Sequence, residues 1–169
     1  MNLWNFALTL YARPGVEVAC LEAQQAGADV CLLLCGAWLD GHDSPYQPAT
    51  GARLRRLAEE RQTALIRPLR HLRQQLREPA LRAPQIAQLR ERIRELELSA
   101  ERQLLEQLEA LCKEEALCES AQREEGAERR PSCTPLWLTA LAAPLAAGHP
   151  ALALIDSQRL AFAGNPAAD

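Results

Sequence analysis

Residues 65–100 read LIRPLRHLRQQLREPALRAPQIAQLRERIRELELSA, and this stretch decides the fold. It holds two stripes of apolar residues that recur every three or four positions: Leu65, Leu69, Leu72 and Leu76, then Ile86, Leu89, Ile93, Leu96 and Ala100. This spacing places apolar side chains along one face of a helix, as in the seam between paired helices. Pro79 and Pro84 bracket the short segment between the stripes, and a short connection makes neighbouring helices antiparallel. The sequence therefore predicts a helical hairpin.

The composition predicts the same structural class for the rest of the chain. Leu and Ala are abundant, and aromatic residues make up only 4% of the 169 residues. Leu, Ala, Glu, Arg and Gln form helices readily because they lose little rotamer freedom there. No long run alternates apolar and polar residues, so we expect no sheet. We predict an all-α protein with hairpin helices over 50–78 and 84–118, the first kinked near Pro68, which removes one backbone hydrogen bond.

Upstream of the hairpin, residues 1–41 predict three short helices over 3–12, 14–26 and 30–40. Residues that typically start or end a helix divide this region: Asn2, Pro14, Gly27, Asp29 and Gly41. Asn and Asp cap helix N-termini, proline suits the first turn, and glycine commonly follows the last turn. Three short apolar helices this close together must bury one another, so we expect them to form a core module.

The predicted domain is a single helical unit over residues 1–120. Its 1–41 core module and its 50–120 hairpin are joined by a turn-rich linker. Beyond it, residues 121–169 begin with a polar linker and continue as an Ala-, Pro- and Gly-rich tail. We expect this tail to be weakly ordered, with one short helix within 135–147.

The three tryptophans are the largest apolar side chains of the chain. Trp4 and Trp38 are expected to anchor the core, although one of them could line a partner groove. Trp137 lies in the tail, within an apolar Leu-Trp-Leu sequence that follows the polar linker. Two interpretations stay open for it: a docking peptide that enters a partner's groove, or a segment that folds back onto its own core.

The net charge of −3 conceals strong segregation along the chain. Residues 1–50 carry −4, residues 51–94 carry +8, residues 95–128 carry −8 and residues 129–169 carry +1. Antiparallel pairing would place the basic start of the first hairpin helix beside the acidic end of the second. At the turn, basic residues of both helices would meet, so the sequence predicts a strongly positive hairpin tip.

This predicted tip is the main candidate binding surface. Its partner-binding residues would be Arg67, Arg70, Arg73, Arg77, Arg90 and Arg94. Arginine offers planar, forked donors that suit carboxylates and phosphates. The tip would bind an acidic protein surface as part of a non-enzymatic helical adaptor. The alternative partners are nucleic acid and the ribosome, although residues 51–130 lack an aromatic stacking platform and any nucleic-acid-binding motif. The remaining interpretation is that these arginines have no binding role and only keep the helix face solvated.

A second alternative is a helical enzyme with a pocket in the N-terminal module, near Trp4, Asp29 and Trp38. We assign no catalytic residues, because there is no nucleophile elbow, phosphate-binding loop or dinucleotide fingerprint. Cys31 and Cys35 share a helix face, with His42 shortly after, but zinc requires a fourth ligand. Their leucine neighbours favour buried apolar thiols. We therefore expect no metal and no cofactor.

The predicted location is the cytoplasm. The start MNLWNF lacks the basic residues of a signal peptide. No uncharged apolar stretch reaches the roughly 18 residues of a membrane span, so we expect no membrane contact. The six cysteines lack the dense spacing of a secreted disulfide scaffold and are read as reduced thiols. The oligomeric state is not predicted.

Several short motifs carry a resemblance to a known family. They are NLWNFA at 2–7, LYARPGV at 10–16, CL at 20–21, DV at 29–30, LLL at 32–34, WL at 38–39, RPLR at 67–70 and ELSAER at 97–102. Together they resemble a proteobacterial family of small helical proteins, a domain of unknown function, over about residues 2–110. The resemblance implies a helical fold and a bacterial cytoplasm, and it implies no catalytic residue. Members commonly carry a polar residue at the position of Cys31, so Cys31 inherits no role.

Overall fold

The computed structural model describes residues 1–122 and 136–163. Within these residues every regular element is helical: α1 (Leu3–Tyr11), α2 (Val16–Gln25), α3 (Val30–Gly41), α4 (Pro48–Arg61), the π-helical turn η1 (Gln62–Ile66), α5 (Arg67–Gln75), α6 (Arg77–Ala80), α7 (Pro84–Gln122), α8 (Leu136–Leu141) and α9 (Pro150–Ala163). The predicted all-α class is thereby confirmed for the described residues.

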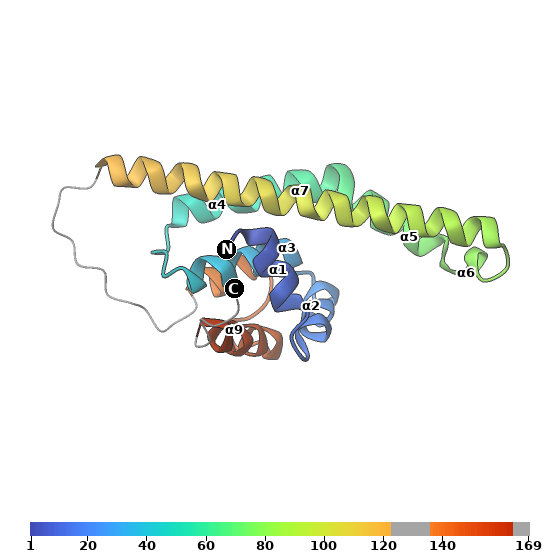
Figure 1. Ribbon diagram of the computed structural model, residues 1–169, viewed down its shortest axis with the longest axis horizontal. Coiled ribbons are helices and arrows are strands. Elements are labelled where there is room, and N and C mark those ends of the chain that lie inside the picture. The colour runs from blue at the N-terminus through green and yellow to red at the C-terminus, as the bar shows by residue number, and fades with distance from the viewer. Residues whose placement is uncertain (123–135, 164–169) are drawn as a thin grey trace.

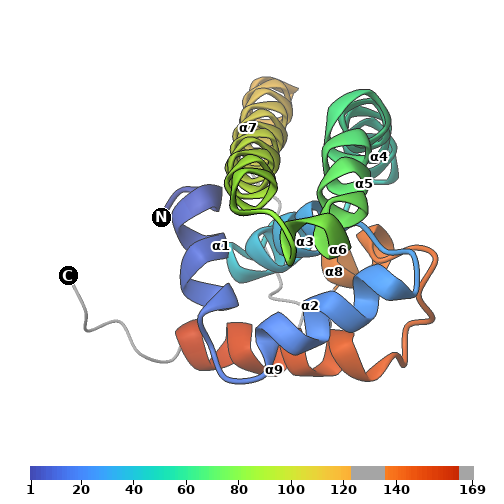
Figure 2. The ribbon, with the colours of Figure 1, turned by 90° about the vertical axis from the view of Figure 1, so that its right-hand side faces the viewer.

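Helix α3 lies at the centre of the fold. All nine residues from 31 to 39 are buried, because this helix is apolar on every face. Figure 2 shows the arrangement around it: the hairpin forms a layer on one side, α1 and α8 flank α3, and α2 and α9 lie on the other side. We call α1, α2 and α3 the N-terminal module.

The ends of the short helices follow the residues that the sequence marks. The Asn2 side chain accepts a hydrogen bond from the Asn5 N–H at 2.8 Å and so caps α1. The Asp29 carboxylate does the same for α3, accepting from the Cys31 N–H at 2.8 Å. Helix α2 begins two residues later than predicted, because Gly15 first reverses the chain with a φ of 80°, a conformation that favours glycine.

In the hairpin, α4, η1 and α5 follow one another as one arm, and α7 runs back beside them (Figure 1). Arg53, near the start of the first arm, forms an ion pair with Glu115 near the end of α7. The charge pattern of the sequence predicts such a contact. Figure 1 also shows that the turn end of the hairpin, with α6, projects beyond the N-terminal module.

The predicted kink near Pro68 takes the form of a widened turn. Proline at this position lacks an N–H, and its ring crowds the carbonyl group of Ala64, four residues earlier. Residues Gln62–Ile66 relieve this crowding by forming a π-helical turn, in which the Arg67 N–H donates to the Gln62 carbonyl oxygen. Gln62 itself is buried, with 5% exposure. Turns of this kind are frequent at functional sites.

The buried seam of the hairpin is narrower than the sequence predicts. Ile93 and Ala100 are buried, but four other predicted seam residues are 43–57% exposed: Leu65, Leu72, Leu89 and Leu96. Each hairpin helix also packs on the N-terminal module, so its buried face is shared between two neighbours. On α7, Leu104 and Leu108 consequently point into the main hydrophobic core.

The described part of the tail differs from the expected weak order and requires a correction. Helix α8 lies inside the range 135–147 where a short helix is expected, whereas α9 is not expected; α8 packs on α3, and α9 packs on α2. A Cβ on Gly36 would lie 2.8 Å from the Leu138 Cα atom, so the backbones of α3 and α8 touch where glycine removes the side chain. Trp137 is 2% exposed and belongs to the core. Of the two interpretations of Trp137, the structure shows the second: this segment folds back onto the protein's own core.

Candidate functional site

Two of the predicted partner-binding arginines belong to an internal ion-pair network between the hairpin arms. The Arg70 Nε atom donates to Glu97 at 2.8 Å, and its Nη2 atom donates to Glu101 at 2.5 Å. The Arg73 Nε atom donates to the other oxygen of Glu97 at 2.5 Å. The Glu97 side chain is 7% exposed, and the side chains of Arg70 and Arg73 are each about one-fifth exposed. These contacts hold α5 against α7.

The pKa values reflect this network. Burial disfavours the ionised form of Glu97, but hydrogen bonds from Arg73 and Arg70 outweigh it and lower the pKa of this carboxyl. The hydrogen bond to Glu97 correspondingly raises the pKa of Arg73. At Glu101, burial prevails over the attraction of Arg70 and raises the pKa. Glu101 is therefore the less fully compensated carboxylate of the two.

The other predicted arginines occupy different settings. Arg67 forms a two-pronged pair with Glu59, with both nitrogen–oxygen distances at 2.7 Å. Arg94 pairs locally with Glu91 on the exposed surface of α7. Arg77 is exposed, and Arg90 is half-buried with an Nε atom that has no hydrogen-bond partner among the described residues.

The projecting turn of the hairpin carries four arginines without an ion pair to any described residue: Arg77, Arg82, Arg90 and Arg92. With Leu81, which is 79% exposed, we call them the basic hairpin end. Glu78 and Glu91 are the nearby carboxylates in the sequence, and Glu91 is already paired with Arg94. Arg82 and Arg92 belong to the positive tip that the sequence predicts but not to its predicted partner-binding residues, because sequence alone does not separate paired from unpaired arginines.

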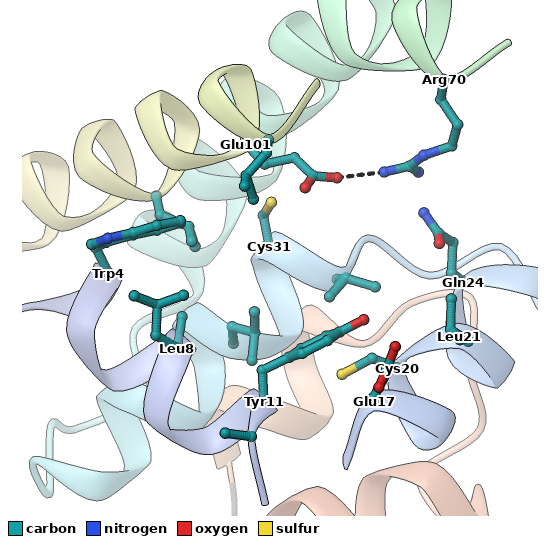
Figure 3. A pocket seen from close by; sticks show the side chains of 16 residues that line it. Trp4, Leu8, Tyr11, Glu17, Cys20, Leu21, Gln24, Cys31, Arg70 and Glu101 are labelled. Carbon is teal, nitrogen blue, oxygen red and sulfur yellow. Dashed lines mark hydrogen bonds and ion pairs between the residues drawn. The ribbon is translucent and has the colours of Figure 1, made fainter. Parts of the chain in front are cut away.

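A cavity of about 410 Å³ lies between the N-terminal module and the underside of the hairpin. Its walls are largely apolar, with Trp4, Leu34 and Leu105 among them. Figure 3 shows the polar end of the cavity, where Glu101 and Arg70 reach down from the hairpin. Tyr11, Glu17 and Gln24 line it from the module. Three partly exposed leucines also line it: Leu8, Leu21 and Leu98.

A second cavity of about 280 Å³ adjoins the first and shares Gln24, Arg70 and Glu101 with it. Asp29 and Gln62 line this second space. The π-helical turn thus brings a buried amide to the carboxylate that caps α3. Burial raises the pKa of Asp29, although hydrogen bonds from the backbone N–H groups of α3 and from Gln62 oppose this.

The structure separates the three residues of the predicted pocket. Trp4 lines the larger cavity, and the Arg102 guanidinium lies 5.3 Å from the centre of its ring. Asp29 lines the smaller cavity. Trp38 lines neither: it is buried in the core, and its Nε1 atom donates to the Met1 carbonyl oxygen at 3.2 Å. The three residues therefore do not line one common pocket: Trp4 and Asp29 line separate cavities between the module and the hairpin, and Trp38 lies in the core.

The thiols of the larger cavity are unsuited to nucleophilic chemistry. Burial raises the pKa of Cys20 to about 12 and raises that of Cys31 well above its ordinary value. Both remain neutral at physiological pH, whereas the thiolate is the reactive form. Among the described residues, no three His, Cys, Asp or Glu side chains gather as metal ligands do.

Hydropathy adds one further finding about the described chain. None of its helices combines the length and the apolar character needed to cross a lipid bilayer.

Comparison with known proteins places the chain in a family. No curated protein and no solved structure matches the chain. A family described as "Protein of unknown function (DUF2390)" matches residues 2–108. This region contains the whole N-terminal module, most of the hairpin and both cavities, and it stops before α8 and α9. Since the match covers more than half of the 169 residues, the chain is a member of the DUF2390 family.

Proposed function

We propose that the protein is a non-enzymatic helical adaptor that binds an acidic protein surface through the basic hairpin end. The observation that carries this proposal is the contrast between two groups of arginines. Arg70 and Arg73 are neutralised inside the fold. Arg77, Arg82 and Arg92, on the projecting turn, are exposed and have no ion pair to a described residue.

Exposed Leu81 supports a protein partner over nucleic acid. Its side chain is 79% exposed and lies directly before Arg82. A leucine framed by arginines matches a partner with carboxylates around an apolar patch, whereas nucleic-acid backbones offer no such contact. The free described cysteines, Cys20, Cys31, Cys35 and Cys112, support the cytoplasm as the location of this adaptor.

The test uses charge reversal at the projecting turn. The variant R77E/R82E/R92E should keep its helicity and lose the partner. The control, R56E/R61E, reverses two exposed arginines nearer the opposite end of the hairpin and leaves the Arg53–Glu115 ion pair intact. Arg70 and Arg73 are unsuitable for this experiment, because reversing them would leave Glu97 buried beside like charge and would disturb the fold.

Affinity capture from native lysate compares the three proteins with and without nuclease, at low and moderate salt. We expect a nuclease-resistant protein partner that wild type and control retain and that R77E/R82E/R92E and raised salt release. A partner that nuclease removes would replace this proposal with the nucleic-acid or ribosome alternative. A partner that the turn variant retains would contradict the role of the basic hairpin end.

A further inference from the structure

The larger cavity has the size and walls of a ligand site. Its volume of about 410 Å³ falls in the range of about 300–1,000 Å³ that small-molecule pockets occupy. Leu8, Leu21 and Leu98 line it, although they are 50%, 45% and 46% exposed. Leucines that line a cavity and remain this exposed leave apolar surface that an apolar group could cover.

The charge around the two cavities is negative. The carboxylates that line them, or that pair with the arginines lining them, are Glu17, Asp29, Glu59, Glu97 and Glu101. The cations of the same network are Arg67, Arg70 and Arg73. Among the described residues, five carboxylates against three guanidinium groups leave an excess of two negative charges when all are ionised. Arg102, which lies against the Trp4 ring, does not change this balance because it is paired with Glu106. The excess negative charge would therefore favour a positively charged ligand in this space over a neutral or negatively charged one.

Among the described residues, Arg70 is the one cation that lines both cavities, and it already has hydrogen-bond partners. It donates to Glu97 and Glu101. With the Gln24 amide oxygen turned towards the guanidinium, Gln24 accepts from the Nη2 atom at 3.1 Å. An anionic ligand would have to compete with two carboxylates and an amide for these donors. Glu101, in contrast, uses only its Oε1 atom in the pair with Arg70, which leaves its Oε2 atom as an acceptor.

Figure 3 shows how this acceptor relates to the apolar walls. The Glu101 carboxylate hangs over the cavity between Arg70 and Cys31, and the rings of Trp4 and Tyr11 line the space beneath. Aromatic rings provide large apolar surfaces against which an apolar group can pack. The polar acceptor and the apolar, aromatic walls are thus combined in one cavity.

We propose that this cavity binds an amphipathic amine, whose ammonium group bonds to Glu101 and whose apolar group lies against Trp4, Leu8 and Leu34. Burial of Glu101 and its raised pKa support this site, since an ammonium group would compensate a carboxylate that Arg70 leaves partly uncompensated. The cavity is separate from the basic hairpin end. A negative result for one proposal therefore leaves the other unaffected.

The test compares three probes with the same eight-carbon chain: octylamine, octanol and octanoate. Isothermal titration calorimetry of the full chain at neutral pH, below the concentrations at which the probes aggregate, gives their dissociation constants. We expect octylamine to bind about tenfold more tightly than the other two, because only its head group forms a charge-assisted hydrogen bond with Glu101. Tighter binding of octanoate, equal binding of all three probes, or no binding would each overturn the proposal.

Variants locate the site. Glu101→Gln should remove the preference for octylamine over octanol and leave the affinity for octanol unchanged. Glu95→Gln, at an exposed position of the same helix, should keep the preference. If circular dichroism shows that Glu101→Gln does not fold, Glu17→Gln replaces it, since Glu17 is exposed and lines the cavity. That variant should weaken octylamine binding selectively. Retention of the full preference in whichever of these two variants is folded would also overturn the proposal.

Discussion

Glu97 is the residue on which the contact between the hairpin arms depends. It is the only carboxylate within the described residues that bonds to two arginines of the opposite arm, Arg70 and Arg73. A buried charge is tolerated when it is paired and hydrogen-bonded, and removing one partner leaves the others uncompensated. Since the Glu97 side chain is 7% exposed, water could not replace the hydrogen bonds that Arg70 and Arg73 donate to it.

We predict that Glu97→Gln lowers the free energy of unfolding by about 3 kcal/mol near neutral pH, because Arg73 loses its ion-pair partner and Arg70 keeps only its pair with Glu101. The pKa of Glu97 is lowered in the fold, so this stabilisation is complete above the ordinary value of 4.5 and is lost as the pH falls through the lowered pKa. The difference between wild type and variant should therefore shrink in acid.

Chemical denaturation over a pH series measures this difference. Glu95→Gln is the control, because Glu95 is exposed on the same helix, and its effect should stay within about 0.5 kcal/mol. A Glu97→Gln variant as stable as wild type at neutral pH would contradict the structural role of the network.

At the scale of elements, two helices begin on carboxylates from distant parts of the chain. Glu109 of α7 accepts from the Leu3 N–H of α1 at 2.9 Å. Asp40 of α3 accepts from the Trp137 and Leu138 N–H groups of α8 at 3.0 and 2.9 Å. The first N–H groups of a helix lack partners within it, and negative charge there also favours the helix dipole. Each of these carboxylates thus joins two elements.

Close contact between α3 and α8 gives the second prediction. In Gly36→Ala, the new Cβ would meet the Leu138 backbone at 2.8–2.9 Å, which no side-chain rotation can relieve. We expect α8 to shift or detach and the free energy of unfolding to fall by about 1–3 kcal/mol. Hydrogen exchange should show lost protection over residues 136–163.

Gly41→Ala is the matched control in the same helix. Its Cβ would meet only the Arg159 side chain, at 3.9 Å or more, which is an ordinary contact. Unchanged protection of residues 136–163 in Gly36→Ala would mean that α8 does not dock on α3 as described.

For the whole molecule, α8 and α9 complete a core that the N-terminal module and the hairpin share. Among the described side chains of these two helices, five large apolar ones are buried: Trp137, Leu138, Leu141, Leu152 and Ile155. Burying a large apolar side chain contributes about 1.5–3 kcal/mol, whereas a whole domain is stable by about 5–15 kcal/mol. The predicted single domain over 1–120 therefore lacks a substantial part of its core.

We predict that a fragment of residues 1–122 keeps helical circular dichroism but loses fixed packing. It should bind ANS and unfold without a sharp thermal transition, because the face of α3 around Gly36 is uncovered. A synthetic peptide of residues 136–163, added in trans, should restore the transition. The same peptide with Trp137→Ala is the control and should restore less. A sharp, peptide-independent transition would show that residues 1–122 fold on their own.

The sequence by itself determined the helical class, the helix ends at Asn2 and Asp29, and the position of the hairpin turn. These features depend on local chemistry: apolar periodicity, side-chain caps and proline. The same reasoning was less accurate for the seam. Leu89 and Leu96 follow the heptad pattern and yet are exposed, since periodicity gives a face and not the neighbour that covers it.

Only the tertiary structure decided which charges are used inside the fold and where the tail packs. Arg70 and Arg77 are equivalent in sequence, but one meets Glu97 across the hairpin and the other projects beyond the module. The cavity likewise needs Trp4 and Glu101, which lie almost a hundred residues apart, to face each other. Such contacts depend on how complete helices pack against one another, and local propensity carries no information about partners at that distance.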